Sequence, residues 1–429
     1  MDKILITGGQ PLHGTIPISG AKNAALPLMI ASLLTPEPLE LSNVPRLADV
    51  SSLLRILTNF GVDHSINGRR IGETSQTGQT IKLSAENIID RVAPYELVST
   101  MRASFWVIAP LLARFGEARV SMPGGCAIGT RPVDLLLMAL QRLGATIDID
   151  GGYVVANAPD GLKGNEIVFP KVTVGGTHVA LMAAALADGT TVIENAAQEP
   201  EIRDLADCLN KMGAQISGAG TSHIEIKGVS SLKGTHHRVM PDRIETGTYA
   251  MAVAITGGDV MLADTHASLL QSALDTLEQT GVSITAYENA IRVEQKSSQI
   301  YPVDITTDPF PGFPTDLQAQ FMGLMTRANG TSRIRETIFE NRFMHVQELV
   351  RLGADIRLDA DCAYVTGKER LTGAPVMATD LRASASLLIA GLAAEGDTTI
   401  NRVYHLDRGF EAIETKLGHC GAVVHRVRE

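Results

Sequence analysis

Hydrophobic residues along the chain fall into two alternating kinds of helix-length segment. Segments of the first kind are rich in small and aliphatic residues, and they cover residues 21–35, 97–113, 174–187, 245–256, 315–328 and 379–394. This composition is typical of helices that are buried on most of their circumference. A Gly or Pro turn and a short strand follow most of them, as in "GTTVIEN" at 189–195.

Segments of the second kind end in Leu-x-x-x-Gly, followed by Ala or Val. The Leu lies one helical turn before the Gly, on the same face, and the Gly suits the left-handed position after a helix. The six copies end at Gly61, Gly144, Gly213, Gly281, Gly353 and Gly421. Their spacings of 83, 69, 68, 72 and 68 residues indicate a unit repeated six times. We expect each repeat to read helix, strand, helix, strand, strand.

Six such repeats predict an α/β fold of two domains with three repeats each and the helices packed inside. The opening "ILITGGQPLHGTIPIS" resembles "IEIKGVSSLKGTHHRVMP" at 224–241, since each precedes a helix of the first kind. We therefore expect one domain from 1–21 plus 241–429 and the other from 22–240. The joins near residues 20 and 240 would then form a hinge. The alternative is two domains divided simply in sequence order.

Composition narrows the classes of function. The chain has 429 residues, 45% of them hydrophobic, and a formal net charge of −10, which argues against nucleic acid as a general partner. No apolar run approaches the roughly 18 residues of a membrane span, and the start does not read as a signal peptide. The four cysteines lie far apart, without metal or dithiol spacing. We expect a cytoplasmic protein without a membrane partner.

Charged side chains gather where loops lead into helices, although the protein is acidic. Near the starts of the first-kind helices stand Lys22, Asn23, Arg102, Lys171, Thr173, Arg243, Glu245, Asp316, Asp380 and Arg382. The loops entering the second-kind helices carry Arg46, Arg131, Arg203, Arg342 and Arg408. Because the guanidinium fork suits phosphate and carboxylate, the pattern indicates a multiply anionic ligand. The alternative is solvated surface charge.

Cys126 stands in "MPGGCAIGTRP", a Gly-rich insertion before the second-kind helix of the second repeat. Such a loop can close over a site as a lid, and Arg131 nearby favours a reactive thiolate. Cys126 could also be an ordinary loop residue. Asp316, in "FPTDLQAQ", is either a helix-capping carboxylate or an acceptor for a hydroxyl proton. His178 and His405 are weaker acid–base candidates.

Eight segments, in order along the whole chain, resemble the UDP-N-acetylglucosamine 1-carboxyvinyltransferase family of enolpyruvyl transferases. They are "SGAKNAALP", "MRASFWV", "PGGCAIGTRPVDL", "PDRIETGTY", "FPTDLQAQF", "ENRFMH", "TDLRAS" and "YHLDRGF". The resemblance implies two inside-out α/β domains with the active site in the cleft between them. It also implies enolpyruvyl transfer from phosphoenolpyruvate to the 3′-hydroxyl of UDP-N-acetylglucosamine, with release of phosphate, at the first committed step of peptidoglycan synthesis. No metal or organic cofactor is implied.

The same resemblance implies roles for individual residues. Phosphoenolpyruvate-binding positions are Lys22, Asn23, Arg131 and Arg408. Positions that contact the UDP-sugar are Arg102, Arg131, Pro132, Val133, Asp134, Leu135, Lys171, Val172, Thr173, Val174, Asp316 and Ile338, and further cleft positions are Arg342, Asp380 and Arg382. Cys126 matches the proton donor that can form a covalent adduct with phosphoenolpyruvate and with fosfomycin. Asp316 matches the carboxylate beside the 3′-hydroxyl.

Two other functions remain open from the residues. One is enolpyruvyl transfer to shikimate 3-phosphate, against which the Gly-Gly-Cys insertion speaks. The other is a non-catalytic protein that binds a UDP-sugar, against which the presence of Lys22, Cys126, Asp316 and Arg408 speaks.

Overall fold

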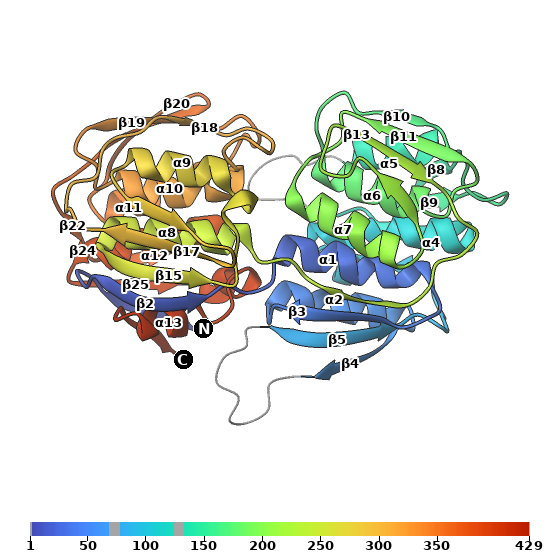
Figure 1. The fold of residues 1–429 in the computed structure, drawn as a ribbon, viewed down its shortest axis with the longest axis horizontal. Helices are drawn as coiled ribbons and strands as arrows, with labels where there is room; N and C mark the ends of the chain where they lie inside the picture. The colour runs from blue at the N-terminus through green and yellow to red at the C-terminus, as the bar shows by residue number, and fades with distance from the viewer. Residues whose placement is uncertain (1, 68–77, 124–132, 429) are drawn as a thin grey trace. The chain divides into compact units, whose positions relative to one another are not determined.

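The computed structural model describes residues 2–67, 78–123 and 133–428 (Figure 1). The chain divides into two compact units. The terminal unit consists of residues 1–19 and 241–429, and the central unit consists of the described residues of 20–240. Each unit is described by itself. The hinge role of the joins stays a prediction.

Each unit is built around three core helices with sheets outside them (Figure 1). In the central unit these are α1 (Lys22–Ala31), α4 (Ile108–Phe115) and α6 (Val174–Ala184). In the terminal unit they are α8 (Arg243–Thr256), α10 (Gln318–Met325) and α12 (Leu381–Ala393). Residues 176–184 of α6 are all buried, because the helix carries small and apolar side chains on every face. The first kind of helix and its burial are confirmed.

The second helix of each repeat ends as predicted. These helices are α2 (Ala48–Asn59), α5 (Asp134–Arg142), α7 (Pro200–Lys211), α9 (Gln271–Gln279), α11 (Val346–Arg351) and α13 (Ile413–His419). The glycine after each has a φ between 91° and 106°. Since this left-handed conformation disfavours any residue with a β carbon, glycine is the residue that ends the helix here.

Among the described residues the strands form six four-stranded sheets, one for each repeat, and a short pair, β22 (Leu371–Thr372) with β24 (Ala394–Glu395). The central unit holds β14 (Thr235–Arg238), β3 (Leu39–Val44), β5 (Gln79–Ser84) and β4 (Asp63–Asn67); β6 (Val92–Ala93), β7 (Glu117–Ser121), β9 (Tyr153–Asn157) and β8 (Thr146–Asp150); and β10 (Glu166–Val168), β11 (Thr190–Glu194), β13 (His223–Lys227) and β12 (Gln215–Ser217). The terminal unit holds β2 (Leu12–Pro17), β15 (Gly258–Ala263), β17 (Ala290–Gln295) and β16 (Ser283–Ala286); β18 (Ile305–Thr306), β19 (Thr331–Arg335), β21 (Cys362–Thr366) and β20 (Asp355–Asp359); and β23 (Pro375–Met377), β25 (Asp397–Asn401), β1 (Lys3–Thr7) and β26 (Val423–Val427).

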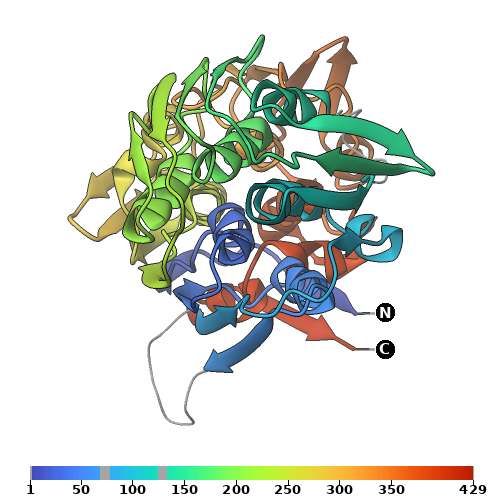
Figure 2. The same cartoon turned by 90° about the vertical axis from the view of Figure 1, so that its right-hand side faces the viewer.

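All six sheets share one pairing scheme, in which a parallel first pair is followed by two antiparallel pairs. In the last sheet β1 lies between β25 and β26, with Ile4 opposite both Ile400 and Arg426. The two ends of the chain therefore lie side by side (Figure 2). β2 precedes α1 in sequence but pairs with β15 of the terminal unit, and β14 precedes α8 but pairs with β3 of the central unit. The sixth repeat is thus completed by the N-terminal strand.

Some helices are shorter or more broken than the pattern suggested. The expected helix over 97–113 consists of α3 (Tyr95–Val98), a 3-10 helix η2 (Arg102–Val107) and α4. Thr100 donates its hydroxyl to the Leu97 carbonyl, a local bond that competes with the helical pattern. Short 3-10 helices also occur as η1 (Ser32–Leu34), η3 (Ala267–Leu269), η4 (Thr315–Leu317) and η5 (Val403–Arg408). No helix in the described ranges is long and apolar enough to span a membrane.

Candidate active site

The proposed lid residues Cys126, Arg131 and Pro132 lie outside the described residues. The roles expected for them stay predictions. The remaining candidates are distributed over both units, and most lie at or near the beginning of a helix, as the sequence predicted.

Asp316 lies at the centre of a charged cluster in the terminal unit. Its Oδ1 accepts a hydrogen bond of 2.8 Å from Nη2 of Arg342, and its Oδ2 accepts one of 2.6 Å from Nη2 of Arg382. Both arginine side chains are buried, whereas 26% of the aspartate side chain is exposed. Pro314, not Asp316, precedes η4, and no side chain caps that helix. The carboxylate is therefore held by cations rather than by helix capping.

Asp380 organises the start of α12 beside this cluster. Its Oδ1 accepts the backbone N–H groups of Arg382 and Ala383 at 2.8 and 3.1 Å. This is the N-cap geometry that satisfies free amides at a helix start. Because the cap fixes the first turn, it also fixes the backbone from which the Arg382 side chain reaches Asp316.

Two histidines next to these charges are unsuited to gain a proton. Burial lowers the pKa of His345 to about 4, where Asp380 acts to raise it and Arg342 to lower it. Burial also lowers the pKa of His405, and the nearby Arg408 adds to this effect. Both rings are therefore neutral at neutral pH. His405, a weaker acid–base candidate from the sequence, lies close enough to Arg408 and Asp380 to feel both charges.

Glu336 orders the loop that carries Ile338, and the sequence analysis missed it. The buried carboxylate accepts hydrogen bonds from the Ile338 backbone at 2.8 Å and from the Thr315 hydroxyl at 2.8 Å. It also accepts one from the Thr307 hydroxyl at 3.0 Å. Since Thr315 begins η4, the same carboxylate connects the Ile338 loop to the segment that bears Asp316. A Glu directly after a strand and before "TIF" was the available signal.

In the central unit, Lys22 and Asn23 form the first two residues of α1. The Lys22 ammonium lies 3.5 Å from a carboxylate oxygen of Asp49, which is buried in the first turn of α2. A cation at a helix N-terminus opposes the helix dipole, so helix stability does not account for Lys22. The ion pair with Asp49, a second residue that sequence reasoning missed, offsets part of this cost.

The remaining candidates of the central unit occupy three further helix starts. Arg102 begins η2, against which both α1 and α6 pack. Thr173 caps α6, since its hydroxyl accepts the Gly176 N–H at 3.2 Å. Of its neighbours, Lys171 and Val174 are exposed and Val172 is half-buried. At the start of α5, Val133 is buried, Asp134 is exposed and Leu135 packs against the core.

His178, the other weak acid–base candidate, is a structural residue. The ring is wholly buried in α6, and burial lowers its pKa to about 3. It packs on Trp106 with a centroid distance of 5.0 Å. Neither ring nitrogen has a hydrogen-bond partner among the described residues. A neutral ring enclosed in this way cannot exchange a proton with a substrate.

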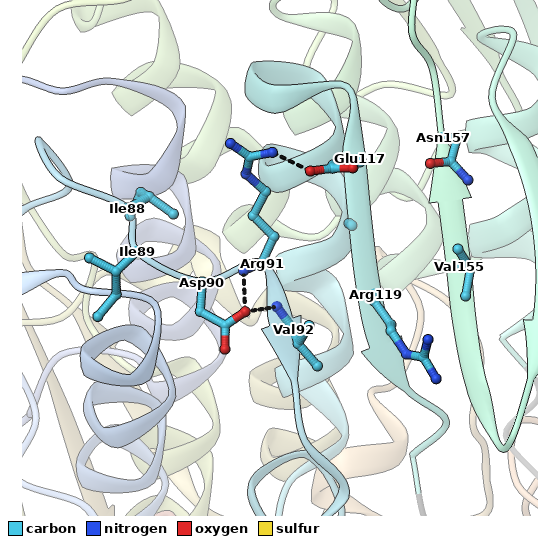
Figure 3. A pocket seen from close by; sticks show the side chains of 10 residues that line it. Ile88, Ile89, Asp90, Arg91, Val92, Glu117, Arg119, Val155 and Asn157 are labelled. Atoms are coloured by element: carbon cyan, nitrogen blue, oxygen red, sulfur yellow. Dashed lines mark hydrogen bonds and ion pairs between the residues drawn. The ribbon is translucent and has the colours of Figure 1, made fainter.

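Other surface features lie away from these residues. A pocket of about 420 Å³ in the central unit is lined by the segment before β6 and by β7 and β9, with Arg91 and Glu117 ion-paired at its wall (Figure 3). None of the candidate residues lines it. In the described part of the chain, no group of three or more His, Cys, Asp or Glu side chains is arranged to hold a metal ion.

Comparison with known proteins identifies the family. The family model for EPSP synthase (3-phosphoshikimate 1-carboxyvinyltransferase) matches residues 6–417. Proteins named UDP-N-acetylglucosamine 1-carboxyvinyltransferase from Methylobacterium nodulans and Methylocella silvestris are 75% and 68% identical, over 428 and 427 residues and 100% of both chains in each pair.

Two solved structures share the fold. The enolpyruvyl transferase NikO from Streptomyces tendae gives a TM-score of 0.85 at 24% identity over 99% of both chains. EPSP synthase from Acinetobacter baumannii gives 0.74 at 19% identity over 100% of both chains. These likenesses confirm the predicted α/β architecture of two three-repeat halves. By the match of its sequence from residue 6 to residue 417, the chain belongs to the EPSP synthase family of enolpyruvyl transferases.

Proposed function

We propose that this protein is a transferase that moves the enolpyruvyl group of phosphoenolpyruvate to the 3′-hydroxyl of UDP-N-acetylglucosamine and releases phosphate. The observation that carries the proposal is 75% identity, over the full length of both chains, to a protein named for this reaction. The charged cluster around Asp316 supports it, since the reaction needs a carboxylate beside a hydroxyl and cations beside anionic groups.

The chemistry is an addition followed by an elimination. In the addition, the sugar oxygen forms a bond to the central carbon of phosphoenolpyruvate, the methylene carbon gains a proton, and the hydroxyl loses one. In the elimination, the carbon–oxygen bond to phosphate breaks and the methyl group returns a proton. We assign the carbon-directed proton to Cys126 and the hydroxyl proton to Asp316.

The cations of the site would stabilise the phosphate and carboxylate of phosphoenolpyruvate. We assign this role to Lys22, Arg131 and Arg408, with Asn23 as a hydrogen-bonding neighbour. Fixed cations in a site that excludes water stabilise developing negative charge far better than solvent does. The UDP-sugar would be held by Arg102, the 131–135 segment, the 171–174 segment and Ile338.

The biological setting follows from the same proposal. A product of this kind is a precursor of peptidoglycan, so the protein would act in the cytoplasm at the first committed step of cell-wall synthesis and support cell shape and division. Phosphoenolpyruvate and UDP-N-acetylglucosamine would be its substrates, with no cofactor. The epoxide fosfomycin would inactivate it by alkylating Cys126, because thiolates attack carbon readily.

The test is phosphate release by the purified protein with phosphoenolpyruvate and each acceptor in turn. We expect release with UDP-N-acetylglucosamine and none with shikimate 3-phosphate. Asp316→Asn should lower turnover about a hundredfold or more, within the usual range for loss of a general base. Release with shikimate 3-phosphate alone would assign the reaction named by the family model, and binding of UDP-N-acetylglucosamine without any release would indicate a non-catalytic binder.

A further inference from the structure

The two oxygens of the Asp316 carboxylate each accept a hydrogen bond from a different arginine. The distances are 2.8 Å to Arg342 and 2.6 Å to Arg382, which are short, charge-assisted contacts. The arginine side chains are 4% and 7% exposed, and that of the aspartate is 26% exposed. The carboxylate is thus the most accessible member of a group whose cations are withdrawn from solvent.

The three side chains come from three separate parts of the terminal unit. Asp316 belongs to η4, Arg342 follows β19, and Arg382 lies in the first turn of α12. The Arg342 guanidinium also lies over the Phe339 ring at 5.2 Å, and Asp380 fixes the backbone of Arg382. Because both guanidinium groups are anchored independently of η4, they determine where the carboxylate lies and which way it faces.

Helix stability does not explain the place of Arg382. A cation in the first turn of a 13-residue helix opposes the helix dipole, and burying a guanidinium carries a desolvation cost. Its partner is instead the carboxylate that the proposed reaction uses. The same holds for Arg342, which is buried outside any helix and makes its short ion pair with that carboxylate.

We propose that Arg342 and Arg382 are positioning residues that keep Asp316 ionised and fix its orientation toward the acceptor hydroxyl. This inference rests on the proposed function. Two cations stabilise the carboxylate form, so Asp316 is a weak proton acceptor. It takes the hydroxyl proton late, as the oxygen's electron pair forms the bond to the central carbon of phosphoenolpyruvate and the oxygen becomes acidic. Protonation of the methylene carbon therefore leads, and loss of the hydroxyl proton follows.

Other charges face this cluster, and they bear on the pH dependence. Those on α12, η5 and the start of α11 are Asp380, Arg408, His405 and His345, and those at the start of α8, which packs against η4, are Asp242, Arg243 and Glu245. α10 carries no charged residue. Since burial keeps both histidines neutral at neutral pH, their charge does not change above pH 6.

The test compares pH profiles of phosphate release for Arg342→Gln, Arg382→Gln and the corresponding Lys variants. Removing one cation should move the acidic limb of both kcat and kcat/KM to higher pH by about one unit, the lower end of the effect of an adjacent arginine on an aspartate. The Lys variants keep the charge, so their limbs should stay near that of the wild type. Arg335→Gln is the matched control, because Arg335 forms an exposed ion pair of 2.8 Å with Asp361 in the same unit.

Several results would overturn the inference. An unmoved acidic limb with a raised KM for phosphoenolpyruvate would make the two arginines substrate-binding residues only. Equal lowering of turnover at every pH, with a lowered melting temperature, would make them structural. A wild type that releases no phosphate with UDP-N-acetylglucosamine would instead refute the proposed function, which separates the two failures.

A direct measurement covers variants that do not fold. In wild-type protein with ¹³C-labelled aspartate carboxyls, the Asp316 signal is identified by its loss in Asp316→Asn. We expect it to remain that of an ionised carboxylate at pH 4, where an unperturbed aspartate is about half protonated. A signal that is half protonated or more at that pH would refute the inference.

Discussion

Glu245 and Lys416 form a buried ion pair in the terminal unit, and breaking it should destabilise that unit strongly. The Lys416 ammonium lies 2.6 Å from Oε1 of Glu245 and donates to the Ser19 hydroxyl at 2.7 Å. Oε2 of Glu245 accepts the Ser19 N–H at 2.7 Å. The side chains of the pair are only 2% and 9% exposed. Lys416→Met keeps most of the volume but leaves the carboxylate without its cation.

The expected loss is about 3–5 kcal/mol at pH 8, the usual effect of removing one partner from a buried pair. For a domain of this size that is roughly 6–20 °C in melting temperature, at about 2–4 °C per kcal/mol. Lys368→Met is the matched control. It breaks an exposed pair with Asp355 at 3.1 Å, which contributes about 1 kcal/mol or less.

The loss should depend on pH with a definite sign. Burial raises the pKa of Glu245, and Lys416 opposes that rise. A glutamate whose folded pKa exceeds its unfolded value of about 4.3 holds its proton more tightly when folded, so stability falls as pH rises through that interval. Without Lys416 the folded pKa is higher still, and the fall extends further up the pH scale. The variant should therefore lose more at pH 8 than at pH 5.

Thermal and urea unfolding followed by circular dichroism measure both effects. The double variant Glu245→Gln with Lys416→Met removes both charges and should be more stable at pH 8 than Lys416→Met alone. A loss below about 1 kcal/mol at pH 8, or a loss that is equal at pH 5 and pH 8, would refute the reasoning.

Two further predictions concern packing and the lid. A β carbon at Gly323 of α10 would lie 2.9 Å from the Ser386 carbonyl oxygen of α12, so Gly323→Ala should cost about 1–3 kcal/mol in urea unfolding. Gly418→Ala, in α13 with no atom within 4 Å of the added carbon, should stabilise by up to about 1 kcal/mol, and equal effects would disprove the close approach. Cys126→Asp should retain transfer with a lower pH optimum, because a carboxylic acid must stay protonated to donate and its reference pKa is about 3.9. It should also escape fosfomycin, and Cys126→Ser should lose most turnover. A fosfomycin adduct on another cysteine in mass spectra would contradict the role of Cys126.

The repeat could be predicted because its signals are local. A Leu one turn before a Gly reports the face and the end of a helix within five residues, and all six glycines have the positive φ that this requires. The break between α3 and η2 could not be predicted, since it depends on one side-chain bond of Thr100. The grouping of Asp316 with Arg342 and Arg382 was likewise out of reach, because these residues are 26 and 66 positions apart in sequence and only the packed repeats bring them together.

One feature of the site was nevertheless visible in the sequence, because it opposes local stability. Lys22, Arg243 and Arg382 each stand in the first turn of a core helix, where the helix dipole favours an anion. The structure provides a compensating contact for each: Asp49 for Lys22, the Phe310 ring at 5.8 Å for Arg243, and Asp316 for Arg382. Positions that break a local rule and are compensated from distant elements are those at which function is expected. The cations at these helix starts are therefore better evidence of an anion-handling site than the total number of arginines, because surface charge would have no reason to be buried and paired there.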